Sequence, residues 1–202
     1  VPSTSLVSGT TADLYRFSVK AASTGSIGIY QFTVNVATSA TPASASTTVT
    51  NLKINAYTDS LFSSPVNGFN PAGQLNDTLT ALITGNNTIT FTASTQTQDY
   101  LQIPAGETYY FRVVGDITLV GSPTGASVVT NIQGDAAYPL VPESTTFQMA
   151  STTNTTAFAT HDDFIWSPNS TTTSTTAGNA WTNGYFVPGL GADNMDAVTL
   201  TK

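Results

Sequence analysis

The clearest pattern in this sequence is the run Tyr30-Gln-Phe-Thr-Val-Asn-Val36, in which large apolar and polar residues alternate strictly. Successive side chains of a β-strand point to opposite faces of the sheet, so this alternation predicts a strand with one buried face. The same period of two recurs at residues 15–19, 89–93 and 109–113. Weaker strand patterns lie at Leu52–Tyr57, Leu79–Ile83, Val128–Ile132 and Thr146–Met149.

Turn signals separate these stretches. Ile103-Pro-Ala-Gly106 has Pro and Gly where a β-turn prefers them, and Gly85-Asn-Asn87 lies between two strand patterns at hairpin spacing. No helical period extends over ten residues. Many short strands with frequent turns predict an all-β fold, an antiparallel Ig-like β-sandwich. We expect residues 10–135 to form this sandwich, preceded by an N-terminal segment (1–9) and followed by an irregular, aromatic-containing C-terminal extension (136–202) that packs on it.

The composition excludes several classes of function. Only 8% of the 202 residues are charged, against ~25% in an average protein. Five basic residues against twelve acidic ones cannot form a phosphate-binding patch, so we expect neither nucleic acid nor an anionic membrane surface as a partner. No apolar run approaches the ~20 residues of a membrane span, so no membrane insertion is expected. Cysteine is absent, which excludes disulfides and thiolate chemistry.

Hydroxyl residues take the place of the missing charges: the chain holds 38 Thr and 20 Ser. A Thr-rich, Lys-poor and acidic composition suits an exported protein, so we predict an extracellular, cell-surface location. The first residues, Val-Pro-Ser, lack an initiator Met and have the character of a processed chain. These features concern location and do not identify an activity.

Several segments together resemble a C-terminal β-rich domain of secreted and cell-surface proteins from ultrasmall candidate-phylum bacteria. The resemblance extends from about residue 9 to Lys202, and the run Trp-Thr-Asn-Gly-Tyr at 181–185 is its most specific part. It implies an envelope location and a structural or assembly role, and it implies no catalytic residues. The segments that carry it are Leu14–Ala21, Gly28–Val34, Tyr110–Asp116, Gln133–Pro139, Asp162–Ser167 and Trp181–Leu190.

Catalytic chemistry has little support in the sequence. His161, the only histidine, lies beside two aspartates and six residues before Ser167. A catalytic triad is defined by spatial geometry rather than by nearness in sequence, so a surface histidine is the simpler interpretation. The carboxylates could form a hydrolytic pair, but none of them is marked as an acid with a raised pKa. We therefore expect no catalytic residues, no enzyme and no cofactor.

Calcium is the metal that the acidic loops would suit, because this cation prefers carboxylate, carbonyl and amide oxygens. One candidate is Asp162 with Asp163, and the other is Asp193 with Asn194 and Asp196. Neither matches the twelve-residue calcium loop with its closing Glu, and solvated loop acids are the alternative.

Four Asn-x-Ser/Thr triplets are candidate glycosylation sites. In so Thr-rich a chain, several such triplets are expected by chance. They begin at Asn76, Asn86, Asn154 and Asn169.

Two further groups of residues suggest binding. Trp166, Trp181 and Tyr185, with the neighbouring Phe186, could stack on sugars, although large aromatic residues more often serve as buried core. The N-terminal segment carries apolar anchors, Val1, Leu6 and Val7, and could complete a neighbour's sheet by β-strand addition. Its alternatives are pairing within its own sandwich or fraying.

Taken together, these patterns predict an extracellular structural protein that self-assembles on the cell surface into a filament or a surface-layer lattice, with copies of itself as partners. The alternative is a carbohydrate-binding or adhesive β-sandwich module whose partners are cell-wall or surface glycans. An exposed tryptophan would favour the second.

Overall fold

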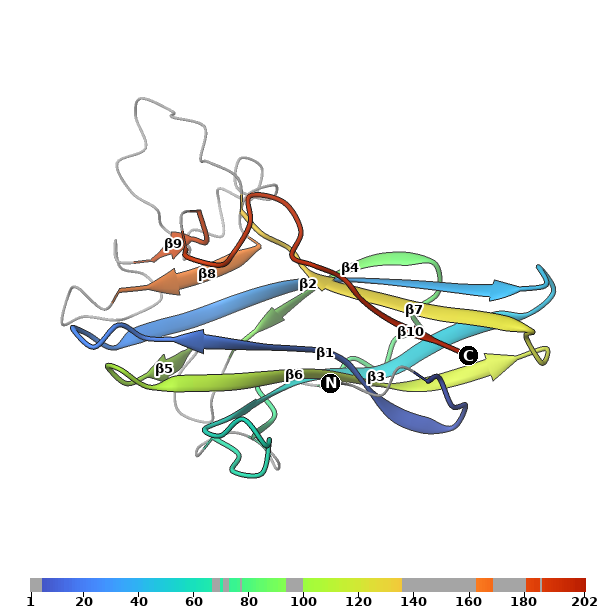
Figure 1. Ribbon diagram of the computed structural model, residues 1–202, viewed down its shortest axis with the longest axis horizontal. Helices are drawn as coiled ribbons and strands as arrows, with labels where there is room; N and C mark the ends of the chain where they lie inside the picture. The colour runs from blue at the N-terminus through green and yellow to red at the C-terminus, as the bar shows by residue number, and fades with distance from the viewer. Residues whose placement is uncertain are drawn as a thin grey trace.

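The computed structural model describes residues 5–66, 70, 73–76, 78–93, 100–135, 163–168, 181–185 and 187–202. Two antiparallel sheets pack face to face (Figure 1), which confirms the predicted all-β sandwich. In chain order, the strands are β1 (Thr10–Lys20), β2 (Ile27–Thr41), β3 (Ser46–Tyr57), β4 (Asn86–Thr92), β5 (Leu101–Ile103), β6 (Thr108–Val120), β7 (Gly125–Ile132), β8 (Phe164–Ser167), β9 (Thr182–Asn183) and β10 (Val198–Thr201).

The larger sheet is built around β2. Residues 34–41 of β2 pair with β7 and residues 28–32 pair with β8, so these two strands follow one another along the same side of β2. β4 and β5 take the other side. β10 extends the sheet beyond β7, and β9 extends it beyond β8. The described residues after position 135 thus contribute three strands, β8, β9 and β10, to this sheet by backbone pairing.

The smaller sheet has the order β1-β6-β3. Both outer strands contain a bulge opposite the same part of β6, near Gly115. A Cβ atom at Gly115 would lie 2.6 Å from Val49 Cγ1, so only glycine fits between the two bulges. The following residue, Asp116, accepts hydrogen bonds from Thr11 on β1 and from Asn51 Nδ2 on β3, the latter at 2.7 Å. These two hydrogen bonds are the main causes that lower the pKa of the Asp116 carboxyl.

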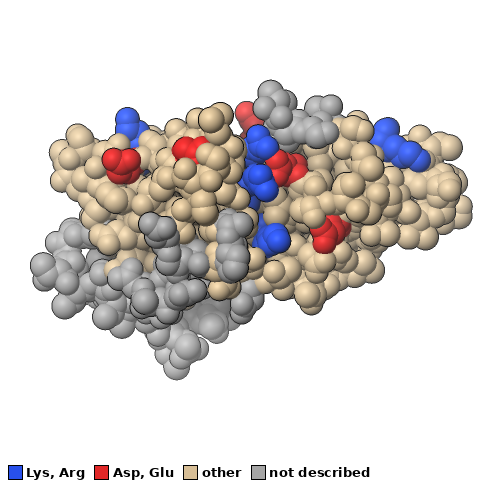
Figure 2. Space-filling model, turned by 90° about the horizontal axis from the view of Figure 1, so that it is seen from below, with Lys and Arg blue, Asp and Glu red and all other residues tan. Residues whose placement is uncertain are grey.

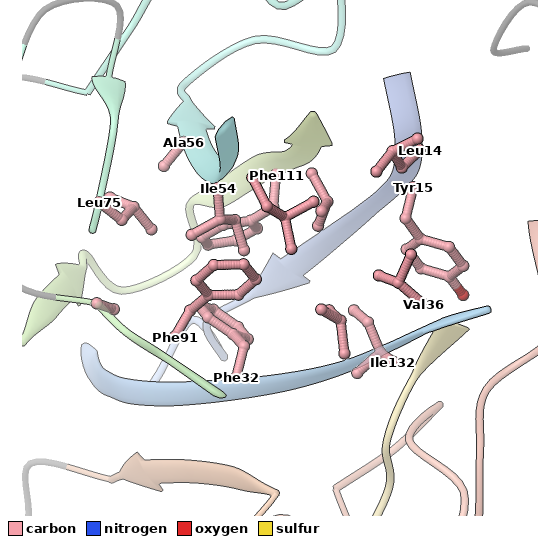
Figure 3. Close-up of a cluster of buried hydrophobic side chains, with 14 of the residues drawn as sticks. Leu14, Tyr15, Phe32, Val36, Ile54, Ala56, Leu75, Phe91, Phe111 and Ile132 are labelled. Atoms are coloured by element: carbon pink, nitrogen blue, oxygen red, sulfur yellow. The ribbon is translucent and has the colours of Figure 1, made fainter. Parts of the chain in front are cut away.

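Aromatic side chains from both sheets fill the centre of the core (Figure 3). Phe111 of β6 stacks on Phe17 of β1 with ring centroids 4.7 Å apart, and Phe32 of β2 contacts Phe111 at 5.1 Å. Phe32 also meets Phe164 of β8 at 5.4 Å. The alternating residues that predicted the strands are therefore the residues that hold the two layers together.

One predicted strand is replaced by irregular chain. Leu79 and Ile83 form only isolated bridges with β3, to Leu52 and Val49. Between the two bridges the chain advances four residues, from Leu79 to Ile83, while β3 spans only three, from Val49 to Leu52. A regular ladder therefore cannot form. The predicted strand at 146–149 lies outside the described residues. The short strands β5, β8, β9 and β10 were not predicted.

In the part of the chain that the structure describes, no helix is long and apolar enough to cross a membrane.

Candidate functional site

The two edge strands of the smaller sheet, β3 and β1, differ in whether other parts of the described chain bond to their outer backbone groups. The β3 edge is covered by the chain that follows it, through bridges from Asn55 to Gln74 and from Leu52 to Leu79. The Leu52 N–H donates to the Leu79 carbonyl at 3.0 Å, and the Ile54 N–H donates to Asn76 Oδ1 at 2.9 Å. The backbone groups of β3 that point away from β6 are thereby satisfied by the protein itself.

The β1 edge is open. Among the described residues, β1 pairs with β6 and with no other strand. The Ala21 N–H donates to the Glu107 carbonyl at 3.0 Å, and this bond shows which residues of β1 direct their backbone groups toward β6. Because bonding alternates along an antiparallel strand, the backbone N–H and C=O groups of Arg16, Ser18 and Lys20 point away from β6.

An apolar cleft of about 720 Å³ lies along this open edge. Consecutive residues from Phe17 to Ala22 line it, so the cleft follows the edge of β1 rather than one face of the strand. Ile27 and Ile29 of β2 and Phe164 of β8 also line it. Further lining residues come from the C-terminal segment, among them Val187, Pro188, Gly189 and Leu190. Lys20 is the only charged residue among the described lining residues.

A buried carboxylate, Asp135, organises one side of this cleft. Its Oδ1 accepts the Asp163 N–H at 2.8 Å, and its Oδ2 accepts the N–H groups of Phe164 and Gly184 at 2.9 and 2.7 Å. Asp135 is 1% exposed, so it joins β8 to the residues that follow β9 through an interior contact. Gly184 also leaves room for Leu190, because a Cβ atom at Gly184 would lie 2.3 Å from a methyl carbon of that residue. Nothing in the sequence marks Asp135 for this role, since its partners are backbone N–H groups, which have no sequence signature.

The three predicted aromatic residues are divided between core and cleft. Trp181 is 1% exposed and packs edge-on against Tyr30 and Tyr100, so it belongs to the core. Trp166 and Tyr185 both line the cleft. The Trp166 Nε1–H donates to the Asn183 carbonyl at 3.1 Å, which fixes its ring in the cleft wall. Phe186 lies outside the described residues.

The acidic residues suggested for calcium are not gathered into one site. Asp193 and Asp196 are exposed, and the backbone carbonyls of both accept protein hydrogen bonds, from the Gly134 N–H at 2.6 Å and from the Tyr15 hydroxyl at 2.9 Å. Asp163 is half-buried beside Asp135, and Asp162 lies outside the described residues. Within the described ranges, no group of three or more His, Cys, Asp or Glu residues could hold a metal ion.

Tyr15 lies where β1 meets the C-terminal segment. Its hydroxyl makes the hydrogen bond to the Asp196 carbonyl, and its ring lines the cleft. Burial raises the pKa of the Tyr15 phenol, and the negative charge of Asp196 raises it further. The phenol is therefore neutral, and a hydrogen-bond donor, throughout the physiological range.

Of the remaining candidates, Asn86 is exposed at the start of β4, whereas the Asn76 side chain is half-buried and bonded to β3. Ser167 is fully buried in β8. His161 and two of the candidate glycosylation sites, Asn154 and Asn169, lie outside the described residues, as does Val1.

Leu6 is 3% exposed and is part of the main core, while Val7 is 54% exposed. The Leu6 N–H donates to the Thr201 carbonyl at 2.9 Å, and Ser5 forms a parallel bridge with Thr201. The N-terminal segment is thus seated against β10 of its own sandwich.

The outer face of the smaller sheet carries most of the cations (Figure 2). Asp13 forms ion pairs with Arg16 and with Arg112, the latter at 2.9 Å from Nε to Oδ1. The Arg16 guanidinium also lies 4.7 Å from the centre of the Phe62 ring. Both arginines are therefore engaged in contacts within the fold.

No protein family, no curated protein and no solved structure matches this chain in the comparisons. The function is therefore inferred from the geometry of the open edge and its cleft.

Proposed function

We propose that this protein is an extracellular structural subunit that assembles with copies of itself on a bacterial cell surface, into a filament or a surface-layer lattice. The observation that carries the proposal is the open edge of β1 beside an apolar cleft. Such an edge accepts an extended segment of another chain by β-strand addition.

The geometry supplies both parts of that interaction. The outward N–H and C=O groups of Arg16, Ser18 and Lys20 offer main-chain hydrogen bonds. A strand placed there would direct every second side chain toward the cleft, where Phe17 and Ile29 offer apolar contact. Backbone bonding therefore contributes affinity, and the cleft selects small or apolar side chains.

The added segment is a part of the next copy other than β1. Two β1 strands paired antiparallel about Ser18 would place Arg16 opposite Lys20, and like charges on directly opposite residues are destabilising. A contact between two different surfaces is heterologous and passes from copy to copy instead of closing a twofold dimer. The low total charge of the chain, 8% of residues, limits repulsion between copies.

The test compares Ser18→Pro with Ser18→Ala. Proline removes one outward N–H but leaves the bonds to β6, because the Ser18 N–H points away from that strand. Electron microscopy and light scattering of the concentrated protein should show regular polymers for the natural chain and for Ser18→Ala. The amount of polymer formed by Ser18→Pro should be at least tenfold lower. Equal assembly of both variants would remove β1 as the acceptor, and a natural chain that stays monomeric would refute the proposal.

A binding module is the second candidate, favoured by Trp166 and Tyr185 in the cleft. The volume lies within the range of small-molecule sites, but the lining is mostly apolar. Because Lys20 is the only charged residue among the described residues that line the cleft, a ligand with an apolar chain and an anionic group fits it better than a glycan. Fluorescence titration with dodecanoate and with a chitin oligomer shows which of these two ligand classes binds. As the control, Trp166→Phe should abolish any fluorescence change that comes from the cleft.

A further inference from the structure

We propose that residues 5–8 are exchanged between copies, so that Leu6 of one subunit occupies the Leu6 site beside β10 of the next. This inference rests on the proposed self-assembly and names a donor segment and its acceptor. It concerns the edge of the larger sheet, and it is separate from the β1 edge of the smaller one.

The acceptor is a site that already fits the segment. Leu6 is 3% exposed and joins the main core, to which Leu200 of β10 also belongs. The Leu6 N–H donates to the Thr201 carbonyl at 2.9 Å, in a parallel pairing of Ser5 with Thr201. A second copy has the same site, so a segment that leaves its own sandwich regains the same contacts in a neighbour.

The segment is weakly attached and has a hinge. Leu6 makes its one backbone bond to β10, and the neighbouring Val7 side chain is 54% exposed. Gly9 has a φ of 78°, and a Cβ atom placed there would meet nothing within 4 Å. Glycine permits rotation here, and a rotation that swings residues 5–8 outward would break the Gly9 N–H bond to the Ile117 carbonyl (2.8 Å) while the β1 ladder from Thr10 onward stays paired to β6.

Besides the Gly9 N–H bond to Ile117, side-chain hydrogen bonds of Ser8 and Thr10 hold this segment within its own subunit. The Ser8 Oγ accepts the Leu119 N–H at 3.0 Å, and the Thr10 Oγ1 donates to the Val7 carbonyl at 2.7 Å. Because exchange conserves the contacts of Leu6 itself, the balance between the two arrangements depends on protein concentration. Donor and acceptor are different surfaces, so repeated exchange links copies in the same head-to-tail sense as the β1 contact.

The absence of cysteine from the chain allows a clean crosslinking test. Ser5→Cys and Thr201→Cys are made as separate proteins, mixed in equal amounts, assembled and oxidised. Paired residues of neighbouring strands lie within disulfide range, so exchange should give a covalent dimer that contains one copy of each variant. As the control, Ser23→Cys, on the exposed β1–β2 turn, replaces Thr201→Cys and should give at least tenfold less of this product.

The double variant Ser5→Cys/Thr201→Cys supplies the complementary result. Oxidised at high dilution, it closes within one chain and holds residues 5–8 in place. Assembly after concentration should then fall at least tenfold and return when a reductant is added. Unchanged assembly of the oxidised protein, or polymers without the mixed crosslink, would overturn the exchange while leaving self-assembly and the β1 edge intact. If the natural chain forms no polymers, the proposed function fails first.

Discussion

The two edges of the three-stranded sheet differ in how their outward N–H and C=O groups are satisfied. The β3 edge is covered by the described residues between 65 and 83, which bridge to it at four places and include the buried Leu75 and Ile83. The β1 edge, of similar length, has no covering strand among the described residues and faces an apolar cleft. Exposed edges invite pairing with other chains, so most proteins protect them. Within the described residues, the chain thus covers one edge of this sheet itself and pairs no strand with the other.

The largest effect should come from loosening the covered edge. Leu75 is 1% exposed in the covering segment, and Leu75→Ala should lower the free energy of unfolding by about 2–5 kcal/mol, because it leaves a cavity over β3. Leu61→Ala is the control: Leu61 is 85% exposed on the same connection, and its truncation should change stability by less than about 0.5 kcal/mol. Urea denaturation measures both. Similar values for the two variants would mean that the segment lies on β3 without contributing to the core.

A smaller effect is expected from the polar contact at the same edge. Asn76→Ala leaves the Ile54 N–H without its acceptor and should cost about 1–3 kcal/mol. Asn76→Asp keeps an oxygen at that position and should retain most of the stability. Both changes remove the glycosylation triplet, so loss of a glycan cannot explain a difference between them. Equal denaturation midpoints for the two variants would contradict the assigned hydrogen bond.

The open edge should tolerate a change that the covered edge would not. Ser18→Pro is expected to cost less than about 1 kcal/mol in the monomer, because Ser18 is exposed and its N–H points away from β6, the only strand that pairs with β1 among the described residues. Thermal unfolding of dilute protein, with Ser18→Ala beside it, measures this cost. A loss of several kcal/mol would show that the Ser18 N–H is bonded within the subunit and that the edge is closed.

Sequence periodicity predicted the sandwich because Phe32, Val34 and Val36, with their counterparts on the other strands, share the face that enters the core. It could not predict which edge is covered, since Leu79 and Ile83 read as a strand but contact β3 only at isolated points. The cleft was missed for a similar reason: Phe17 and Trp166 are far apart in the chain, and backbone pairing brings them together. Of the aromatic candidates, Trp166 and Tyr185 lie in the cleft and Trp181 in the core, and the sequence has no signal for this division.

The smallest effect concerns Asp116, which joins both edge strands to β6 through Thr11 and Asn51. Because these bonds lower its pKa in the folded state, the ionised form contributes stability above the ordinary value of about 4, and this contribution is lost as the pH falls through the folded value. The Asp116 side chain is half-buried at the surface and solvent still screens its charge, so Asp116→Asn should cost about 1 kcal/mol or less at neutral pH. In urea denaturation, the difference between the natural chain and this variant should shrink toward zero at about pH 2. A difference that persists in acid would mean that packing, and not the carboxylate charge, holds the two edges to the central strand.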